Sequence, residues 1–378
     1  LDQRDPASLA VIPARRAGRR SSDSQRRPGQ GYREVSRWRS WLLLGIVVAA
    51  LIGSALVVLG IGAVRVPVSD VARVVARRFR LIEGADVTVL NDQIVWQMRA
   101  PRVIGSMAVG ALLAMCGAVL QTLTGNDLAD PYLLGISSGA SVGAVFVLIV
   151  GISSTLGQSV LMTLASFIGA VVALVMVLTM ATGRSGELPA GRTILAGVAV
   201  GQLCGAAVSV MIMIFGESNA ARSALSWTLG SFAGLRWGST ITLVVATVPA
   251  LVVGMALCHI LDAFAFGDIS AMSLGVPVNT VRWAIMVSTA LLTALSVAFA
   301  GPIGFVGLTV PHIVRFWTGS RHARLLPISA LAGALLMVWS DTAARCLRPD
   351  TEIPVGVITA IVGAPVLVVL LRRQASRS

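Results

Sequence analysis

The chain has 378 residues, of which 56% are hydrophobic and 12% are charged, and its mean hydropathy is +0.84. Soluble globular proteins carry about twice that fraction of charged residues, so the composition excludes an ordinary soluble domain. The net charge of +13 comes entirely from arginine, because the sequence contains no lysine.

Residues 1–40 form an arginine-rich segment ahead of the first apolar run. They hold ten arginines, namely Arg4, Arg15, Arg16, Arg19, Arg20, Arg26, Arg27, Arg33, Arg37 and Arg39. This composition is typical of a disordered cytoplasmic tail that touches anionic lipid. A nucleic-acid-binding arm is the alternative, but no folded nucleic-acid module accompanies the segment. The basic stretch is also longer than that of a secretory signal peptide.

Ten apolar segments follow, each bounded by glycine, proline or charge. They cover residues 41–64, 101–123, 132–151, 156–182, 193–216, 237–260, 281–300, 303–317, 325–344 and 354–371. Because the runs are continuously apolar and many approach the roughly 20 residues that cross a bilayer, they predict helices and not barrel strands. A shorter piece at 221–232 is expected to lie at an interface. We therefore expect an all-α polytopic membrane protein, with one ten-helix domain over 41–373 and a cytoplasmic tail over 374–378.

The distribution of arginine predicts the orientation of the helices. Ten spans place both ends of the chain on one side, and with these ends inside the inner segments hold nineteen arginines against eleven outside. This arrangement follows the positive-inside rule and predicts a multi-pass membrane protein with both termini in the cytoplasm. Between the spans the bias reverses, because the first outer loop (65–102) holds seven arginines. We expect that excess to have a function.

The absence of lysine bears on ATP chemistry. A phosphate-binding GxxxxGK[ST] loop needs a lysine, so the chain is expected to have no ATP site of that type. If the chain takes part in ATP-driven transport, hydrolysis is expected to belong to another subunit, and this chain is then not an enzyme. Ion-driven transport would need acidic or histidine residues inside spans. The main candidate is Asp341, which lies one helical turn from Arg345. Structural pairing of these two is the favoured interpretation, and a proton relay at Asp341 is the alternative.

Several long motifs resemble one transporter family. The segment WQMRAPRVIGSMAVGALLAMCGAVLQTLTGNDLADPYLLGISSGASVGA (96–144) is similar to part of the iron-siderophore, haem and cobalamin importer permeases of the ABC type. So are residues 301–345 and 352–373, together with RTILAGVAVG (192–201) and GDISAMSLGV (267–276). The resemblance covers roughly residues 40–373. The chain departs from the family at Asp127, where proline is usual.

The resemblance implies a ten-helix permease that pairs with a second permease copy or a paralogue around a central pathway. The implied partners are two ATP-binding subunits inside, an extracytoplasmic solute-binding protein outside and membrane lipid, without nucleic acid. The chain itself is expected to bind no cofactor or metal, with ATP and Mg on the partner subunits. The implied cargo is an iron chelate, with a ferric siderophore favoured and haem or cobalamin as alternatives. A proton-coupled secondary transporter is the alternative from another class.

Two groups of site residues follow from the resemblance. A segment resembling the family's ATPase-coupling helix consists of Gly267, Asp268, Ile269, Ser270, Ala271, Met272, Ser273, Leu274 and Gly275, in which small residues permit close docking and Met272 and Leu274 supply apolar contact. Arg99, Arg102 and Arg345 stand where the family presents arginines to carboxylates of the binding protein. Snorkelling or helix-end neutralisation is the competing interpretation, and Arg102 is the one for which it is favoured.

Three histidines raise the question of haem or iron ligation, namely His259, His312 and His322. The resemblance places His312 in a motif shared whatever the cargo, and His322 lies in a basic inner loop. Because the family moves metals already chelated, ligation by these side chains is the disfavoured hypothesis.

Overall fold

The computed structural model describes residues 37–62, 64–81, 87–151, 157–183, 186–216, 218–348 and 351–375. Its long helices are α1 (Arg37–Gly60), α4 (Ala100–Thr124), α5 (Ile136–Val150), α6 (Gln158–Ala181), α7 (Ala190–Phe215), α9 (Trp237–Ala256), α12 (Val278–Ala300), α13 (Val306–Thr318), α14 (His322–Cys346) and α15 (Val355–Ala375). Shorter helices are α2 (Val68–Arg78), α3 (Val89–Asp92), the π-helix η1 (Gln93–Arg99), the 3-10 helix η2 (Pro131–Leu134), α8 (Ser218–Thr228), α10 (Cys258–Phe264) and α11 (Asp268–Ser273). Residues 1–36 of the tail predicted over 1–40 lie outside the described residues.

The all-α, multi-pass fold is confirmed. Seven segments in the described part of the chain are long and apolar enough to cross a membrane, namely Trp41–Gly60, Val89–Thr124, Gln158–Ala181, Gly191–Phe215, Trp237–Ala256, Val278–Ala300 and His322–Cys346. The predicted spans at 132–151, 303–317 and 354–371 form shorter helices, α5, α13 and α15. The thirteen residues of α13 extend only about 20 Å as an α-helix. This helix begins at Val306 and not at the predicted residue 303, because Phe305 has a left-handed backbone with φ of 70°.

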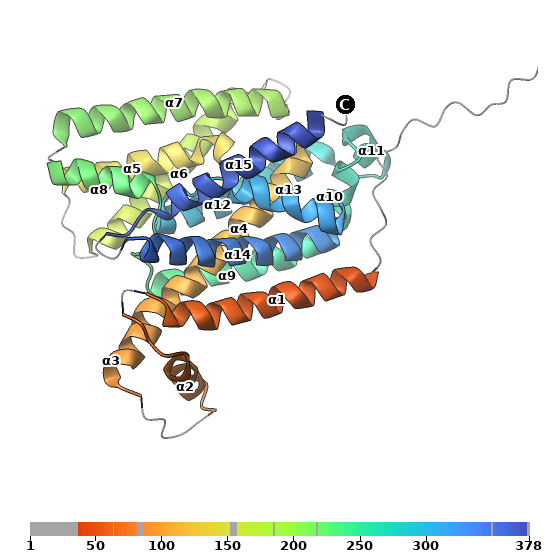
Figure 1. The fold of residues 1–378 in the computed structure, drawn as a ribbon. Helices are drawn as coiled ribbons and strands as arrows, with labels where there is room; N and C mark the ends of the chain where they lie inside the picture. Colours follow the sequence, from red (N-terminus) through yellow and green to blue (C-terminus); the bar gives the residue numbers. More distant parts are fainter. Residues whose placement is uncertain are drawn as a thin grey trace, which may run out of the picture. The chain divides into compact units, whose positions relative to one another are not determined.

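Helix α4 is the centre of the bundle, and most of its side chains are buried, including all of those from Ala108 to Leu123. It packs against α14, α9, α13 and α12 (Figure 1). Glycine makes the closest approaches possible: a Cβ atom on Gly110 would overlap the backbone of Gly333 in α14, and one on Gly117 would overlap the backbone of Gly307 in α13. Without side chains at these positions the backbones touch, which favours helix association in lipid.

A second group of helices, α5, α6 and α7, packs beside this centre (Figure 1). Gly139 and Gly143 of α5 lie against the α6 backbone, as their four-residue spacing predicts. Helix α7 carries Gly197, Gly201 and Gly205 at the same four-residue spacing, but not all of them meet a neighbouring helix. Gly197 meets the carbonyl oxygen of Leu133, whereas a Cβ on Gly205 would have no neighbour within 4 Å.

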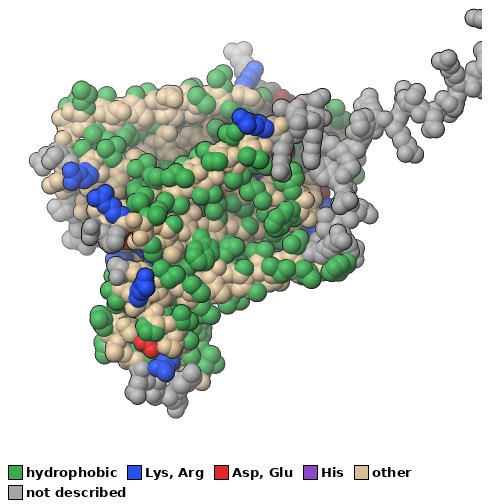
Figure 2. Space-filling model, viewed as in Figure 1, with side chains coloured by type: hydrophobic (Ala, Val, Ile, Leu, Met, Phe, Trp, Pro, Cys, Tyr) green, Lys and Arg blue, Asp and Glu red, His purple; other side chains and the backbone are tan. Residues whose placement is uncertain are grey.

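The short helices cluster at the two ends of the bundle. In Figure 1, α2 and α3 lie at one end and α10 and α11 at the other, and we call these the α2 end and the α11 end. Figure 2 shows hydrophobic side chains over the face between them, with charged side chains mostly toward the ends. This distribution suits a protein whose sides face hydrocarbon and whose ends face water.

Candidate functional site

The predicted coupling segment forms a small helix at the α11 end. Gly267 and Gly275 bracket α11, and both have positive φ, +91° and +81°. Glycine adopts this backbone without steric cost, which allows the chain to turn sharply on both sides of six helical residues. Asp268, the first helical residue, lies 2.5 Å from the guanidinium of Arg282 in α12. This ion pair attaches the segment to a long helix.

The outer face of α11 is apolar and exposed. Ile269, Met272 and Leu274 are 82%, 56% and 72% exposed, and Phe266 just before the helix is 80% exposed. Ala271 is fully buried and holds the helix against the chain. Four large exposed apolar side chains within the nine residues 266–274 are typical of a protein contact. The exposed apolar surface predicted for Met272 and Leu274 is present, and the coupling role stays a prediction.

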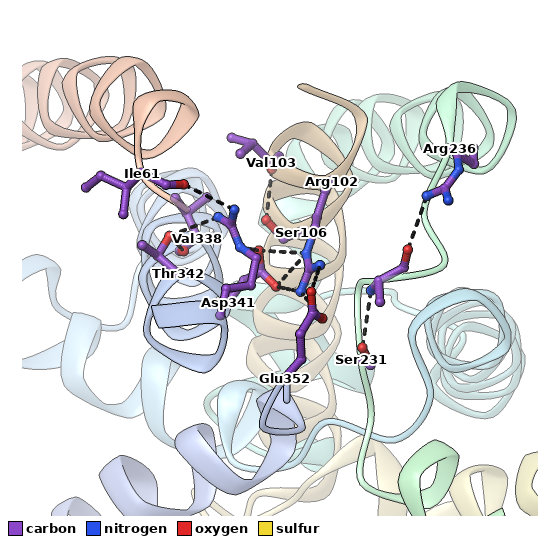
Figure 3. A network of polar contacts seen from close by, with 12 residues as sticks. Ile61, Arg102, Val103, Ser106, Ser231, Arg236, Val338, Asp341, Thr342 and Glu352 are labelled. Atoms are coloured by element: carbon purple, nitrogen blue, oxygen red, sulfur yellow. Dashed lines mark hydrogen bonds and ion pairs between the residues drawn. The ribbon is translucent and has the colours of Figure 1, made fainter. Parts of the chain in front are cut away.

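Four charged side chains form a network at the α2 end (Figure 3). Arg102 of α4 donates from Nε and Nη2 to Asp341 Oδ1 of α14, at 3.0 and 2.8 Å, and from Nη1 and Nη2 to the Glu352 carboxylate, at 2.9 Å each. Arg345 Nε lies 3.1 Å from Asp341 Oδ2. Asp341 is only 1% exposed, so two guanidinium groups compensate one buried carboxylate. The predicted pairing of Asp341 with Arg345 is confirmed, with Arg102 as a further partner.

Arg99 and Arg345 bond backbone carbonyls at the end of α1 and just after it. Arg99 Nη1 donates to Leu59 O at 2.8 Å, its Nη2 donates to Val64 O, and Arg345 Nη1 lies 3.4 Å from Ile61 O. The last carbonyls of a helix lack partners within it and carry partial negative charge, so guanidinium groups stabilise them. The sequence offered no signal for this contact, because it joins residues 40 and 284 positions apart.

The three arginines at which docking was considered are buried or nearly buried in this chain. Arg99 is 7% exposed, and the side chains of Arg102 and Arg345 are 11% and 8% exposed. Their hydrogen-bonding capacity is directed into this chain, which matches the interpretation that competed with docking. Docking through Arg99, Arg102 and Arg345 stays a prediction, now without an accessible surface to support it.

Other arginines at the α2 end do reach the surface. They are Arg65, Arg73, Arg77, Arg78, Arg80 and Arg236. Arg73 has half of its side chain exposed while lying 3.6 Å from Asp70. Arg78 pairs with Asp92 at 2.6 Å and lies over the Trp96 ring. All of these except Arg236 lie in the predicted first outer loop (65–102), whose excess of arginine was expected to have a function.

The unusual Asp127 has a partner in α13. Its carboxylate forms an ion pair with Arg315, whose Nη2 also lies 3.4 Å from the carbonyl oxygen of Ala118 in α4. Where the resembling family has a proline, this chain therefore joins the turn after α4 to α13 through charge. The next acidic residue, Asp130, accepts a hydrogen bond from the Tyr132 backbone. Burial raises the pKa of Asp130 to about 6, although this hydrogen bond opposes the shift.

The three histidines lie in different surroundings. His259 is exposed on α10, His312 stacks edge-on against Phe316, and His322 is buried beside Asp262. Among the described residues, no group of three or more His, Cys, Asp or Glu side chains is placed to hold a metal ion. The disfavoured ligation hypothesis gains no geometric support from these positions.

This architecture matches that of known transport proteins. Residues 43–373 match the model of the FecCD transport family, so the chain belongs to that family. It is 39% identical over 285 residues to the vitamin B12 import system permease protein BtuC of Vibrio cholerae, covering 75% of this chain and 84% of BtuC. It is 38% identical to BtuC of Salmonella typhimurium, over 77% and 87% of the two chains. The protein is thus an ABC importer permease.

Solved structures agree with this assignment. An inward-facing ABC transporter assigned to the metal-chelate type superposes with a TM-score of 0.75 and 28% identity, covering 88% of this chain and 99% of that one. PsaBC from Streptococcus pneumoniae superposes with a TM-score of 0.53 over 74% of this chain and 93% of its own, at 17% identity. The second likeness shows the fold alone.

Proposed function

We propose that the chain is the membrane pathway of an importer for a bulky metal chelate, driven by ATP-binding subunits and supplied by a solute-binding protein. The observation that carries the proposal is the exposed apolar face of α11 at one end of a permease of the FecCD family. In this scheme the bundle lies in the bacterial inner membrane, with the α11 end and both termini in the cytoplasm and the α2 end outside.

The coupling step is assigned to α11. Ile269, Met272 and Leu274 supply the apolar contact to an ATPase subunit, and the Asp268–Arg282 ion pair passes its movement to α12. ATP hydrolysis and its Mg ion belong to the partner subunits. This chain then makes and breaks no covalent bond, and it changes only which side of the pathway is open.

Cargo of this size requires more space than the chain offers by itself. The apolar cavity between α4, α9 and α12 has a volume of about 330 Å³, near the lower limit of pockets that hold drug-sized molecules. Helix α7 leaves most of its surface uncovered, because few of its residues are buried in this chain. A second permease copy would supply the other wall of a larger pathway. This arrangement supports a dimer of identical or paralogous permeases.

A ferric siderophore, haem and cobalamin compete as cargo. The ferric siderophore is the cargo first favoured from the resemblance, whereas the two BtuC relatives are named as permeases of vitamin B12 import systems. Because 39% identity extends over three quarters of the chain, cobalamin gains weight as the second candidate. For the docking of a loaded binding protein, the exposed arginines at the α2 end are the cationic surface, since cationic groups steer acidic partners in solution.

Reconstituted uptake tests the function and its cargo. The permease would be purified with the ATPase and binding protein encoded beside it and placed in proteoliposomes. We expect ATP-dependent uptake of radiolabelled cyanocobalamin or of ferrichrome, a ferric siderophore, and the accepted probe identifies the cargo class. Uptake that continues without the ATPase and collapses with the proton gradient would instead establish the secondary-transporter alternative.

A further inference from the structure

Three polar side chains from three separate helices meet inside the α11 end. His322, the first residue of α14, places Nδ1 2.7 Å from Asp262 Oδ1 of α10 and Nε2 2.8 Å from Thr122 Oγ1 of α4. The backbone N–H of His322 also donates to Asp262 Oδ1, at 2.8 Å. His322 is 1% exposed, and its imidazole has both nitrogens occupied. This cluster is not part of α11 or of the network at the α2 end.

The cluster lies directly behind the coupling segment along the chain. Asp262 belongs to α10, and only Ala265–Gly267 separate the end of α10 from α11. Leu261 and Phe264 on either side of Asp262 are buried in the apolar core. Among the described residues, two carboxylates of the α10–α11 unit therefore attach it to the bundle. One, Asp268, forms the ion pair with Arg282 of α12, and the other, Asp262, pairs with His322.

The protonation of the cluster fixes its hydrogen bonds. Burial alone would raise the pKa of Asp262, but the hydrogen bonds and charge of His322, with a smaller contribution from His259, hold it below its ordinary value. An ionised carboxylate only accepts hydrogen bonds, so Nδ1 of His322 donates to Asp262. Nε2 can then either accept a hydrogen bond from the Thr122 hydroxyl or donate one to it. When Nε2 donates, the hydroxyl can donate to Ala118 O, which lies 3.0 Å from Thr122 Oγ1. The bridge from α10 to α4 therefore persists whether the imidazole is neutral or charged.

A link that persists in both protonation states is suited to transmitting movement. Hydrogen bonds of 2.7 and 2.8 Å resist displacement, and breaking one would leave a buried polar group without its partner. We propose that His322 is a positioning residue of the coupling path, whose imidazole carries displacement of α10–α11 to α4 and α14. This inference rests on the proposed importer function, because it assumes that an ATPase moves α11.

Two replacements of His322 separate its two contacts. His322→Asn keeps an amide N–H near the place of Nδ1 and loses the contact with Thr122, whereas His322→Gln reaches toward Thr122 and loses the geometry at Asp262. Thr122→Val removes the same hydroxyl contact at nearly constant volume, and Thr122→Ser restores the hydroxyl. His259→Gln is the matched control, because this histidine is on α10 but is exposed.

The measurement is the amount of probe transported per ATP hydrolysed by the complete complex in proteoliposomes, with cyanocobalamin and ferrichrome as probes. We expect His322→Asn, His322→Gln and Thr122→Val each to lower this ratio roughly tenfold, within the range of couplings between sites. Thr122→Ser and His259→Gln should keep the wild-type ratio. Complexes are compared only when size-exclusion chromatography shows intact assembly, and Thr122→Val supplies the test if the His322 variants do not assemble.

The outcomes distinguish this inference from the proposed function. A wild-type complex that transports neither probe and shows no ATP hydrolysis stimulated by binding protein would refute the importer proposal itself. The role of His322 would be overturned by a different result. The wild-type complex would be coupled, and Thr122→Val and every His322 variant that assembles would keep the wild-type ratio of transport to ATP hydrolysis. An equal loss of coupling in His259→Gln would also overturn this role, because the effect would then not depend on the buried bridge.

Discussion

Arg102 and Asp341 form a two-pronged ion pair that joins α4 to α14, with Nε and Nη2 of the guanidinium 3.0 and 2.8 Å from the same carboxylate oxygen. Planar guanidinium groups suit this geometry, and few other side chains can replace them. The carboxylate side of the pair is buried, because Asp341 is 1% exposed. The other partner of Arg102, Glu352, is 44% exposed. These exposures predict that these residues contribute unequally to stability.

Replacing Arg102 with methionine should destabilise the protein strongly. The change leaves Asp341 buried with one partner, and breaking a buried pair typically costs about 3 kcal/mol or more. Glu352→Gln is the matched control, since an exposed ion pair contributes less than about 1 kcal/mol. Thermal unfolding of the purified permease in detergent measures both. Equal shifts for the two variants would contradict the interpretation.

Close helix packing predicts a sharp contrast between two glycines. Gly117→Ala places a Cβ against the backbone of Gly307, whereas Gly205→Ala meets nothing within 4 Å. We expect Gly117→Ala to abolish or greatly reduce the yield of folded protein. Gly205→Ala should be neutral or stabilising by up to about 1 kcal/mol, because alanine is the better helix former. Yield and monodispersity after membrane extraction report the difference.

The apolar face of α11 should tolerate charge poorly once the ATPase is present. Met272→Asp or Leu274→Asp should weaken ATPase association at least about tenfold, a loss typical of an interface hot spot, while the permease alone remains folded. Thr280→Asp is the control, because this residue is exposed near the start of α12, outside the segment. Co-purification and titration of the ATPase onto detergent-solubilised permease provide the measurement. Comparable weakening by all three variants would remove the assignment.

Exposed and buried arginines should respond differently to substitution. Arg73→Glu on α2 is expected to weaken binding of the solute-binding protein, and the loss should fade as salt screens surface charge. Arg99→Gln should mainly lower thermal stability, because its guanidinium bonds the end of α1. Binding isotherms at two ionic strengths, combined with unfolding curves, separate the effects. Selective loss of binding in Arg99→Gln would restore the docking role first expected for this residue.

Asp130 should make stability depend on pH. Burial raises its pKa to about 6 from an ordinary 3.8, so the folded state holds the proton more tightly than the unfolded state. Its contribution is fully present below pH 3.8 and is lost as pH rises through about 6. At pH 7.5 Asp130→Asn should therefore unfold at a higher temperature than the wild type, and the gap should close near pH 4. A gap of constant size across this range would contradict the shift.

The sequence predicted local features well and distant contacts poorly. Hydropathy located the spans because it is a property of short stretches of chain. The segment around α11 was identified from its resemblance to a family motif, which is also local in sequence. The Asp341–Arg345 pair was also accessible, since its members lie one turn apart on one helix. The bonds from Arg99 to Leu59 and from Arg102 to Asp341 depend on how helices pack. The resemblance therefore suggested a docking role for Arg99 and Arg345, which helix packing buries.

The bonds at the α2 end have a consequence for biosynthesis. Arg102 precedes its partner Asp341 by 239 residues in the chain. At about 5–20 residues per second, a ribosome needs roughly 12–48 s to make that length. During that interval the charges on α4 lack their final carboxylate, so a nascent permease must keep them hydrated at the membrane surface or shielded by a companion. The Arg102–Asp341 ion pair can therefore form only after α14 has been made, so α4 and α14 are joined late in synthesis.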